Sequence, residues 1–245
     1  MLCSQTQRKL FELKLHGIAA ALKEQMESSQ YEELGFLDRL SLLLDRELTL
    51  RENRKLQRLL NGAKLRQQAC IEDVDFQVPR NLDKTLVLSL ASCEWIAKGH
   101  NLLVTGPTGV GKSYLACALG HQCCLHGKKV LYFRMSAFLR ELKDRRDRGE
   151  FIKLQKQLLK TSLLILDDFG LQELKQQERM DFLDILDDRA NRLSTIIVTQ
   201  VPINHWHELI GESTIADAIL DRFIHNAYQI QMKGESMRKK KKRSG

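Results

Sequence analysis

Apolar residues in the first part of the chain recur at helical spacing among many charged residues. Four leucines stand three or four positions apart, which is the spacing of one face of an amphipathic helix. They are Leu37, Leu40, Leu44 and Leu48. The dipeptide Asn61-Gly62 predicts the end of this helical region, because both residues accept the left-handed backbone that ends many helices. We therefore predict a small helical domain over residues 1–66.

The pattern changes near residue 100, where short apolar runs alternate with segments of helical spacing. Four of the five runs are apolar at nearly every position, which is typical of strands buried on both faces, and strands that alternate with helices form parallel sheets. The runs are NLLVT at 101–105, KVLYFR at 129–134, SLLILD at 162–167, TIIVT at 195–199 and YQIQM at 228–232. The sequence thus predicts an α/β domain over residues 67–237 with a five-stranded parallel sheet, and a helix from about Asp83 to Lys98 before its first strand.

Composition narrows the classes of protein that fit this pattern. Of the 245 residues, 43% are hydrophobic and 29% are charged. No apolar run approaches the ~18 residues of a membrane span, and the N-terminus lacks the apolar core of a signal peptide. We expect a cytoplasmic protein with no membrane partner. The six cysteines form no Cys-x-x-Cys pair, which favours reduced thiols over a zinc site. The formal net charge of +8 favours a polyanionic partner, nucleic acid first.

The sequence GPTGVGKS at 106–113 follows the first predicted strand and opens a helix, which is the context that a phosphate-binding P-loop requires. Its glycines let backbone N–H groups surround phosphate oxygens, and the helix N-terminus adds a positive end. Lys112 is expected to contact the β- and γ-phosphates of ATP, and the Ser113 hydroxyl is expected to bind Mg²⁺. The predicted nucleotide-binding residues are Gly106, Pro107, Thr108, Gly109, Val110, Gly111, Lys112 and Ser113.

A second motif, SLLILDDFG at 162–170, supplies the acidic groups that such a site needs. Its apolar run delivers Asp167 to the carboxyl end of the sheet, where a Walker B carboxylate acts on Mg²⁺. Asp168 follows, and its predicted role is that of a general base that polarises the attacking water; capping of the strand end is the alternative. A strand–helix unit separates the two motifs, so the strand TIIVT can lie between them and present Gln200 to the γ-phosphate.

Five blocks of the chain, in this order, resemble the IstB-like ATP-binding proteins. The blocks are GPTGVGKSYLACALG, LLILDDFG, DDRANRLSTIIVTQVPINHWHELIG, IADAILDRFIHNAYQI and MKGESMRKK. This family comprises AAA+ ATPases that assist the transposition of bacterial insertion sequences and are related to the replicative helicase loader DnaC. The resemblance spans about residues 5 to 240, and the order and spacing of the blocks make it more specific than the P-loop alone.

The resemblance implies further roles. Arg222, in LDRF, matches the arginine finger that AAA+ proteins insert into a neighbouring subunit's site, and Arg238, in GESMRK, matches a second nucleotide-sensing arginine. A surface salt bridge is the alternative for each of them. Gln200 stands where Asn is common among AAA+ proteins, and Asp168 stands where Glu is usual, so its shorter side chain bears on the hydrolysis rate. The chain ends soon after Arg238, so we expect a P-loop AAA+ core without a C-terminal lid domain and a basic tail over residues 238–245.

Two basic clusters are candidates for contact with the phosphates of duplex DNA. The first stands at i, i+3, i+4 and i+7, which puts four cations on one helical face, and the second lies before the Walker B strand. A solvated, charge-mixed surface is the alternative for both clusters. The candidate residues are Arg51, Arg54, Lys55 and Arg58 in the first and Lys143, Arg145, Arg146 and Arg148 in the second.

The leading functional hypothesis is an ATPase that forms homo-oligomeric rings or spirals on DNA and assists a transposase. ATP and Mg²⁺ are its implied cofactors. Three alternatives stay open at this point. A helicase loader of the DnaC type shares the ATPase core and differs in the partner of its N-terminal domain. A small-molecule P-loop kinase needs an acceptor pocket and a lid. A nucleotide-gated interaction module turns over little ATP.

Overall fold

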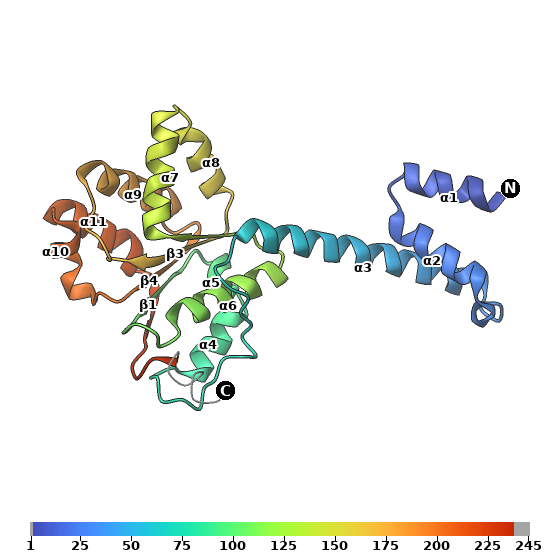
Figure 1. Cartoon of the computed structure of the whole chain (residues 1–245), viewed down its shortest axis with the longest axis horizontal. Coiled ribbons are helices and arrows are strands. Elements are labelled where there is room, and N and C mark those ends of the chain that lie inside the picture. Colours follow the sequence, from blue (N-terminus) through green and yellow to red (C-terminus); the bar gives the residue numbers. More distant parts are fainter. Residues whose placement is uncertain (1, 238–245) are drawn as a thin grey trace. The chain divides into compact units, whose positions relative to one another are not determined.

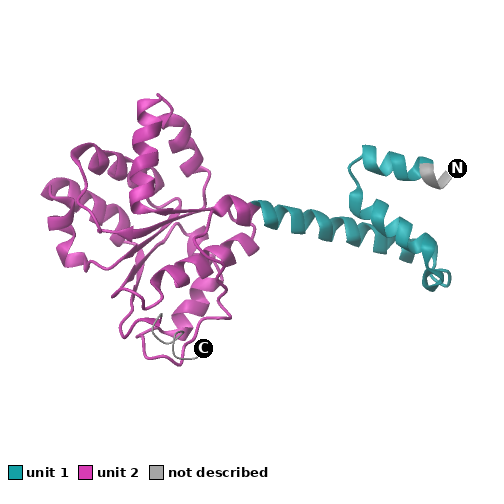
Figure 2. Ribbon diagram, in the orientation of Figure 1, with its two compact units in different colours: residues 1–58 teal, residues 59–245 magenta. Residues whose placement is uncertain are grey.

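The protein is described here from a computed structural model, which describes residues 2–237. Contacts along the chain divide it into two compact units, residues 1–58 and 59–245 (Figure 2). The sequence predicts residues 59–66 in the helical domain, whereas the contacts assign them to the larger unit. The reason is local packing, since Ala63 is fully buried and Leu65 lies against Gly120.

The first unit is helical, as the spacing of its apolar residues predicts. Its elements are α1 (Leu2–Glu12), α2 (His16–Glu27), the 3-10 turn Ser29–Tyr31 and the long helix α3 (Phe36–Ala63), seen in Figure 1. Helix α3 has 28 residues and continues through Asn61-Gly62, so the predicted stop is wrong. Helices tolerate both residues in their interior at a modest cost. The left-handed residue that follows the helix is Lys64, with φ of 53°.

The leucine stripe of α3 is not the buried face of this helix. Leu37 is 75% exposed and Leu48 is 58% exposed, whereas Leu43 and Glu47 are buried. The Glu47 carboxylate accepts hydrogen bonds from the backbone N–H of Gly17, at 2.6 Å, and of Ile18. A carboxylate at a helix N-terminus stabilises that end of the helix. The spacing of the leucines identifies an apolar face of α3, but this is not the face that packs. The hydrogen bonds of Glu47 to the start of α2 determine which face of α3 is buried.

The second unit contains the sheet that the sequence predicts. The strands are β1 (Asn101–Thr105), β2 (Val130–Arg134), β3 (Leu163–Phe169), β4 (Ser194–Thr199) and β5 (Ala227–Gln231). They form one five-stranded sheet in the order β2-β3-β4-β1-β5, and every pairing is parallel. Strand β4 lies between β1 and β3, as expected. The carboxyl ends of β1, β3 and β4 therefore meet at one edge of the sheet.

Helices cover both faces of the sheet (Figure 1). On one face, α6 (Lys112–Leu125) lies against the strands and α4 (Lys84–Ala91) packs on α6. Gly120 of α6 has no room for a side chain, since an added Cβ would lie 2.8 Å from Ile165 of β3. The predicted helix over 83–98 is instead two helices, α4 and α5 (Glu94–Ala97), because Cys93 takes a left-handed conformation with φ of 60°.

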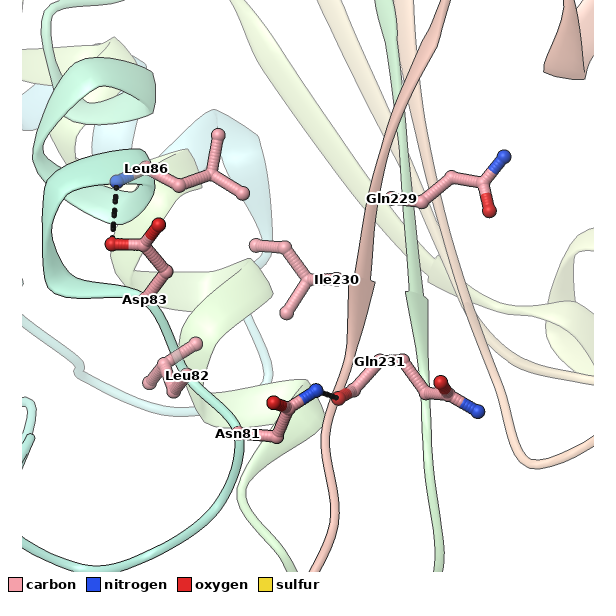
Figure 3. Close-up of a pocket in the computed structure, with 7 residues that line it drawn as sticks. All are labelled: Asn81, Leu82, Asp83, Leu86, Gln229, Ile230 and Gln231. Atoms are coloured by element: carbon pink, nitrogen blue, oxygen red, sulfur yellow. Dashed lines mark hydrogen bonds between the residues drawn. The ribbon is translucent and has the colours of Figure 1, made fainter.

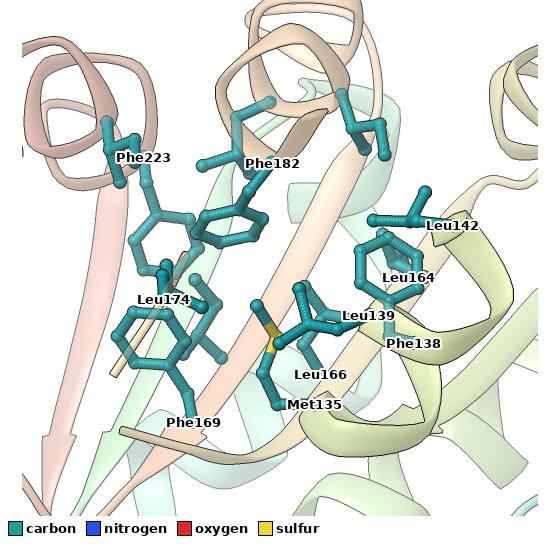
Figure 4. Close-up of a cluster of buried hydrophobic side chains, with 14 of the residues drawn as sticks. Met135, Phe138, Leu139, Leu142, Leu164, Leu166, Phe169, Leu174, Phe182 and Phe223 are labelled. Atoms are coloured by element: carbon teal, nitrogen blue, oxygen red, sulfur yellow. The ribbon is translucent and has the colours of Figure 1, made fainter. Parts of the chain in front are cut away.

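The other face carries a large cluster of buried hydrophobic side chains. Phe138, Phe169, Phe182 and Phe223 interlock there with leucines of β3 (Figure 4). Burial of aromatic and aliphatic area of this kind is the main favourable term in folding. The helices that supply these side chains, together with one 3-10 turn, are α7 (Met135–Asp147), α8 (Phe151–Leu159), α9 (Gln176–Arg189), the turn Ile203–His205, α10 (Trp206–Ile210) and α11 (Ser213–Ile224).

Candidate nucleotide site

The loop between β1 and α6 has the backbone of a phosphate cradle. Gly106, Gly109 and Gly111 have φ of 145°, 87° and 103°, values that glycine adopts far more readily than other residues. A Cβ at Gly106 would lie 2.4 Å from the carbonyl oxygen of Met232, so this glycine also allows a close approach of the chain after β5. Helix α6 begins at Lys112, which leaves the first N–H groups of the helix at the loop.

Lys112 lies inside this loop rather than in solvent. Its side chain is 8% exposed, and its Nζ donates hydrogen bonds to the carbonyl oxygens of Gly106 at 2.7 Å and Pro107 at 2.8 Å. Burial lowers the pKa of Lys112, and the charges of Asp167 and Asp168 oppose that shift. The loop carbonyl oxygens thus hold the ammonium group where it feels the electrostatic field of both carboxylates.

The two aspartates stand in an irregular end of β3. The pairing of β3 with β4 shifts between Leu166 and Phe169, and Asp168 takes a left-handed backbone with φ of 61°. Asp167 is fully buried, and its Oδ1 accepts a hydrogen bond from the Asp168 N–H at 2.8 Å. Bulges of this kind re-aim side chains next to active sites. Here the bulge leaves Asp167 in the protein and turns Asp168 toward the pocket.

Two residues that the sequence analysis does not single out touch these aspartates. The Tyr132 hydroxyl, on β2, donates a hydrogen bond of 2.6 Å to Asp167 Oδ2. Burial, followed by this bond, raises the pKa of Tyr132, so the phenol stays protonated as a donor. Arg66 Nη1 lies 3.6 Å from Asp167 Oδ2 and 3.5 Å from Asp168 Oδ2. A tyrosine in the otherwise apolar run VLYF is the one sequence signal that points to such a contact.

Gln200 follows β4 and reaches the P-loop. Its Oε1 accepts a hydrogen bond of 2.6 Å from the Thr108 hydroxyl. Thr199, one position earlier, is buried, and its hydroxyl donates to the Phe169 carbonyl oxygen at 2.7 Å. The predicted polar side chain at the end of the central strand therefore lies beside the loop, and Thr199 ties that strand to the end of β3.

These groups surround a pocket of about 760 Å³, a size suited to a nucleotide. Thr108, Gly109, Gly111, Lys112, Ser113, Asp168 and Gln200 line it, together with Arg66, Arg80, Met232 and Met237. Gly106, Pro107, Val110 and Asp167 do not reach its surface. Arg238, the predicted second sensor, lies outside the described residues. The chain leads toward the pocket before that point, since the Met237 N–H donates to the Gly109 carbonyl oxygen at 2.9 Å.

Arg80, which the sequence pattern does not indicate, holds the phosphate-binding loop through hydrogen bonds. Its guanidinium is buried and donates to the carbonyl oxygens of Val110, at 3.0 Å, and Asp75. Its own carbonyl oxygen accepts from the Lys233 N–H at 2.9 Å. Nothing in the residue pattern near Pro79 indicates this role, because the partners are backbone groups brought together by the fold.

The residues fit the cofactors that the motifs imply. The glycine loop offers N–H groups to phosphates. Ser113 is the oxygen ligand expected for Mg²⁺ beside a triphosphate, and Asp167, behind the pocket surface, is expected to act on the ion mainly through water. Asp167 is fixed from three sides by Tyr132, Arg66 and the Asp168 N–H. A buried carboxylate with this many partners keeps a defined orientation.

A second hollow, of about 430 Å³, lies between β5 and the segment before α4 (Figure 3). Two of the polar side chains there already have partners. Asn81 Nδ2 donates to the Gln231 carbonyl oxygen at 2.8 Å, and Asp83 Oδ1 accepts from the N–H groups of Thr85 and Leu86 at the start of α4. No predicted site residue lines this hollow, so the candidate chemistry lies in the larger pocket.

Arg222 does not join the pocket of its own chain. It lies on α11, where its Nε donates to Asp187 Oδ1 and its Nη1 donates to Asp221 Oδ2, both at 2.9 Å. The guanidinium is exposed. These bonds hold two of its three nitrogens and orient the group at the surface of the unit.

The two basic clusters differ in how many of their cations already form ion pairs within the protein. Arg51, Arg54, Lys55 and Arg58 are all exposed on α3, with Arg51 paired to Glu47. In the second cluster, Arg145 pairs with Glu141 and Glu150, and Arg146 pairs with Asp181 and lies over the Phe151 ring. Lys143 and Arg148 are exposed, and within residues 2–237 the structure gives neither an ion pair. Arg145 and Arg146 therefore have a structural role in addition to any role in binding.

No helix among the described residues is both long and apolar enough to cross a membrane.

Comparisons with known proteins agree with this geometry. The family model described as IstB-like ATP binding protein matches residues 8–245. The insertion sequence ATP-binding protein y4pL of Sinorhizobium fredii is 46% identical over 243 residues, which cover 99% of this chain and 99% of that protein.

Solved structures share the fold of the second unit. The crystal structure of the DnaC helicase loader gives a TM-score of 0.56 at 22% identity, covering 67% of this chain and 96% of that one. The structure of AMPPCP-bound DnaA from Aquifex aeolicus gives a TM-score of 0.58 at 21% identity, covering 74% of this chain and 55% of that one. At these identities the likeness shows an AAA+ fold alone.

Proposed function

Because the chain belongs to the IstB-like ATP-binding proteins, we propose that it is an ATPase of an insertion sequence that assembles on duplex DNA and assists a transposase. One observation carries the proposal. Lys112, Asp168 and Gln200 line one pocket, while Arg222 of the same chain does not line it and is bonded to Asp187. A site with this division is complete only when a second copy supplies the arginine.

Within one subunit, each group has a distinct task. The P-loop N–H groups bind the phosphates, and Lys112 leaves the carbonyl oxygens of Gly106 and Pro107 to contact the β- and γ-phosphates. Ser113 and Asp167 would hold Mg²⁺, Asp167 mainly through water, and the ion would supply positive charge beside the phosphates. Asp168 accepts a proton from the attacking water, which Gln200 helps to orient. Water attacks the γ-phosphorus, and the bond to the ADP oxygen breaks.

The assembly step depends on the exposed guanidinium of Arg222. Asp187 and Asp221 hold its Nε and Nη1, which leaves Nη2 for the γ-phosphate in a neighbouring subunit. ATP thereby joins two subunits, and hydrolysis removes the group that joins them. This cycle makes the assembly on DNA dependent on the bound nucleotide.

DNA contact is assigned to exposed cations to which the structure gives no ion pair within residues 2–237. Arg54, Lys55 and Arg58 on α3 and Lys143 and Arg148 at the end of α7 meet this condition better than Arg145 and Arg146. Contacts of this type are to phosphates and carry little sequence information. The similarity to y4pL, an insertion sequence ATP-binding protein, favours the transposition branch over a helicase loader.

The variant Asp168→Asn tests the hydrolytic role. Asn keeps the shape of the side chain and tolerates the left-handed backbone at this position, but it does not accept a proton. We expect ATP affinity within about threefold of the wild type and an ATPase rate lower by about 10²-fold or more. Phosphate release at saturating ATP and titration with a fluorescent ATP analogue measure the two quantities.

The same variant is expected to remain on DNA in ATP for longer than the wild type, because its assembly is not released by hydrolysis. Asp147→Asn, at an exposed aspartate that does not line the pocket, serves as a matched control and keeps its ATPase activity. A wild-type hydrolysis rate in Asp168→Asn would reject Asp168 as the base.

A further inference from the structure

Arg66 brings a positive charge into the nucleotide pocket from a segment with no nucleotide-binding motif. It lines the pocket, and its Nη1 lies 3.5 Å from Asp168 Oδ2 and 3.6 Å from Asp167 Oδ2. Its side chain is 30% exposed. One guanidinium therefore bridges the carboxylate assigned to the metal and the carboxylate assigned to the water.

The backbone that carries Arg66 is fixed to the P-loop helix. Leu65 packs on α6 at Gly120, where an added Cβ would lie 3.1 Å from the leucine Cδ2. Burial raises the pKa of the Cys117 thiol, also on α6, and the nearby backbone of Gln67 and Arg66 opposes that shift. These contacts stand on both sides of Arg66, so the guanidinium is delivered to the carboxylates from a defined position.

Two cations act on the two carboxylates, and Arg66 is the one that forms ion pairs with them. Asp167 and Asp168 contribute two negative charges, and Lys112 and Arg66 contribute two positive charges. Arg80, the other arginine of the pocket lining, directs its Nη groups to backbone carbonyl oxygens instead. Without Arg66, the two carboxylates would keep Lys112 as a neighbouring cation but would have no ion pair among the described residues.

We propose that Arg66 is a positioning residue that neutralises and holds Asp167 and Asp168, and so sets how strongly nucleotide binding depends on a divalent cation. The inference rests on the proposed ATP site. Loss of the guanidinium has two effects of the same sign. Bare carboxylates repel a nucleotide that carries no metal, and they attract a divalent ion more strongly. Both effects increase the ratio of the dissociation constant in EDTA to that in Mg²⁺.

Titration of the full chain with a fluorescent ADP analogue, in EDTA and in Mg²⁺, measures this ratio. For Arg66→Gln we expect the ratio to rise by about tenfold or more, since a charge of one sign is removed within ~4 Å of two carboxylates. Arg66→Lys restores a charge and is expected to stay within about threefold of the wild type. Lys64→Gln removes an exposed charge two positions away and serves as the matched control, with a ratio that does not change.

Thermal unfolding of each variant checks that the fold is intact. If Arg66→Gln is unstable, Arg66→Lys still tests the inference. A role that depends on charge requires the ratio of dissociation constants of Arg66→Lys to follow that of the wild type. An Arg66→Gln ratio within twofold of the wild type would overturn the inference and leave the ATP site standing. A wild-type protein that binds no nucleotide in either buffer would overturn both the inference and the proposed function.

Discussion

The Arg222→Ala variant is expected to bind ATP with wild-type affinity and to lose most of its ATPase activity. The residue lies outside the pocket of its own chain, so its loss leaves the bound nucleotide's contacts within the subunit intact. An arginine finger stabilises charge that develops in the transition state and contributes about 10³-fold or more to the rate. Steady-state phosphate release, measured beside nucleotide titration, gives the two quantities.

Mixing experiments show whether this arginine acts on a neighbouring subunit. Arg222→Ala keeps an intact P-loop, and Lys112→Ala keeps an intact arginine, so a shared site forms where the two variants adjoin. We expect ATPase activity to return in mixtures at a level well above either variant alone. Arg192→Ala, an exposed arginine just after α9, is the control and keeps full activity. An absence of activity at every mixing ratio would weigh against a site shared between subunits.

Lys112→Ala is expected to weaken ATP binding by about 10²-fold or more. Lys112 is the one cation that the loop itself holds, and its ammonium group lies within hydrogen-bonding distance of the loop carbonyl oxygens. Its removal takes away a charged hydrogen bond to the phosphates and leaves the fold of the loop to its glycines. Fluorescence titration with an ATP analogue measures the loss.

Lys98→Ala, at an exposed lysine of the same unit, gives the reference for a simple change in net charge and is expected to bind ATP normally. Tight binding by Lys112→Ala would contradict the assignment of residues 106–113 as the phosphate-binding loop. ATP-dependent assembly on DNA is expected to disappear together with binding, because the same nucleotide joins the subunits.

Strands β1, β2, β3 and β4 were predictable because each is a short run in which most side chains are buried. Leu163, Leu164, Ile165 and Leu166 of β3 are fully buried, and only a central strand accepts such a run. The position of β4 between β1 and β3 followed from the chain order of the two motifs. In the α/β unit, the local pattern and the tertiary structure therefore agree.

The helical unit was harder to predict, because its packing depends on a contact that spacing does not contain. Leu37 and Leu48 form an apolar stripe, but the face of α3 that meets α2 carries Leu43 and Glu47. Glu47 is there to cap α2 at Gly17, a pairing across about thirty residues of sequence. Hydrophobicity alone would place the leucine stripe on the packed face, whereas the face that packs contains the buried, hydrogen-bonded Glu47.

The residues of the site also fall into two groups, those that a local motif predicts and those that only the tertiary structure brings to the site. The P-loop and the two aspartates are local motifs, and a local motif can be read from the sequence. Arg66, Tyr132 and Arg80 act through contacts with residues far along the chain, and each contact exists only after the sheet has formed. Their residue types are common on helix ends, strands and loops, so no pattern separates them from ordinary structural positions.

Electron microscopy of the protein on duplex DNA, with and without a non-hydrolysable ATP analogue, tests the central claim most directly. The proposed function depends on nucleotide that joins neighbouring subunits through Arg222. Rings or spirals that surround or follow the DNA with the analogue, and that are absent without nucleotide, are the expected result. Monomers that are indifferent to both DNA and nucleotide would contradict the proposal.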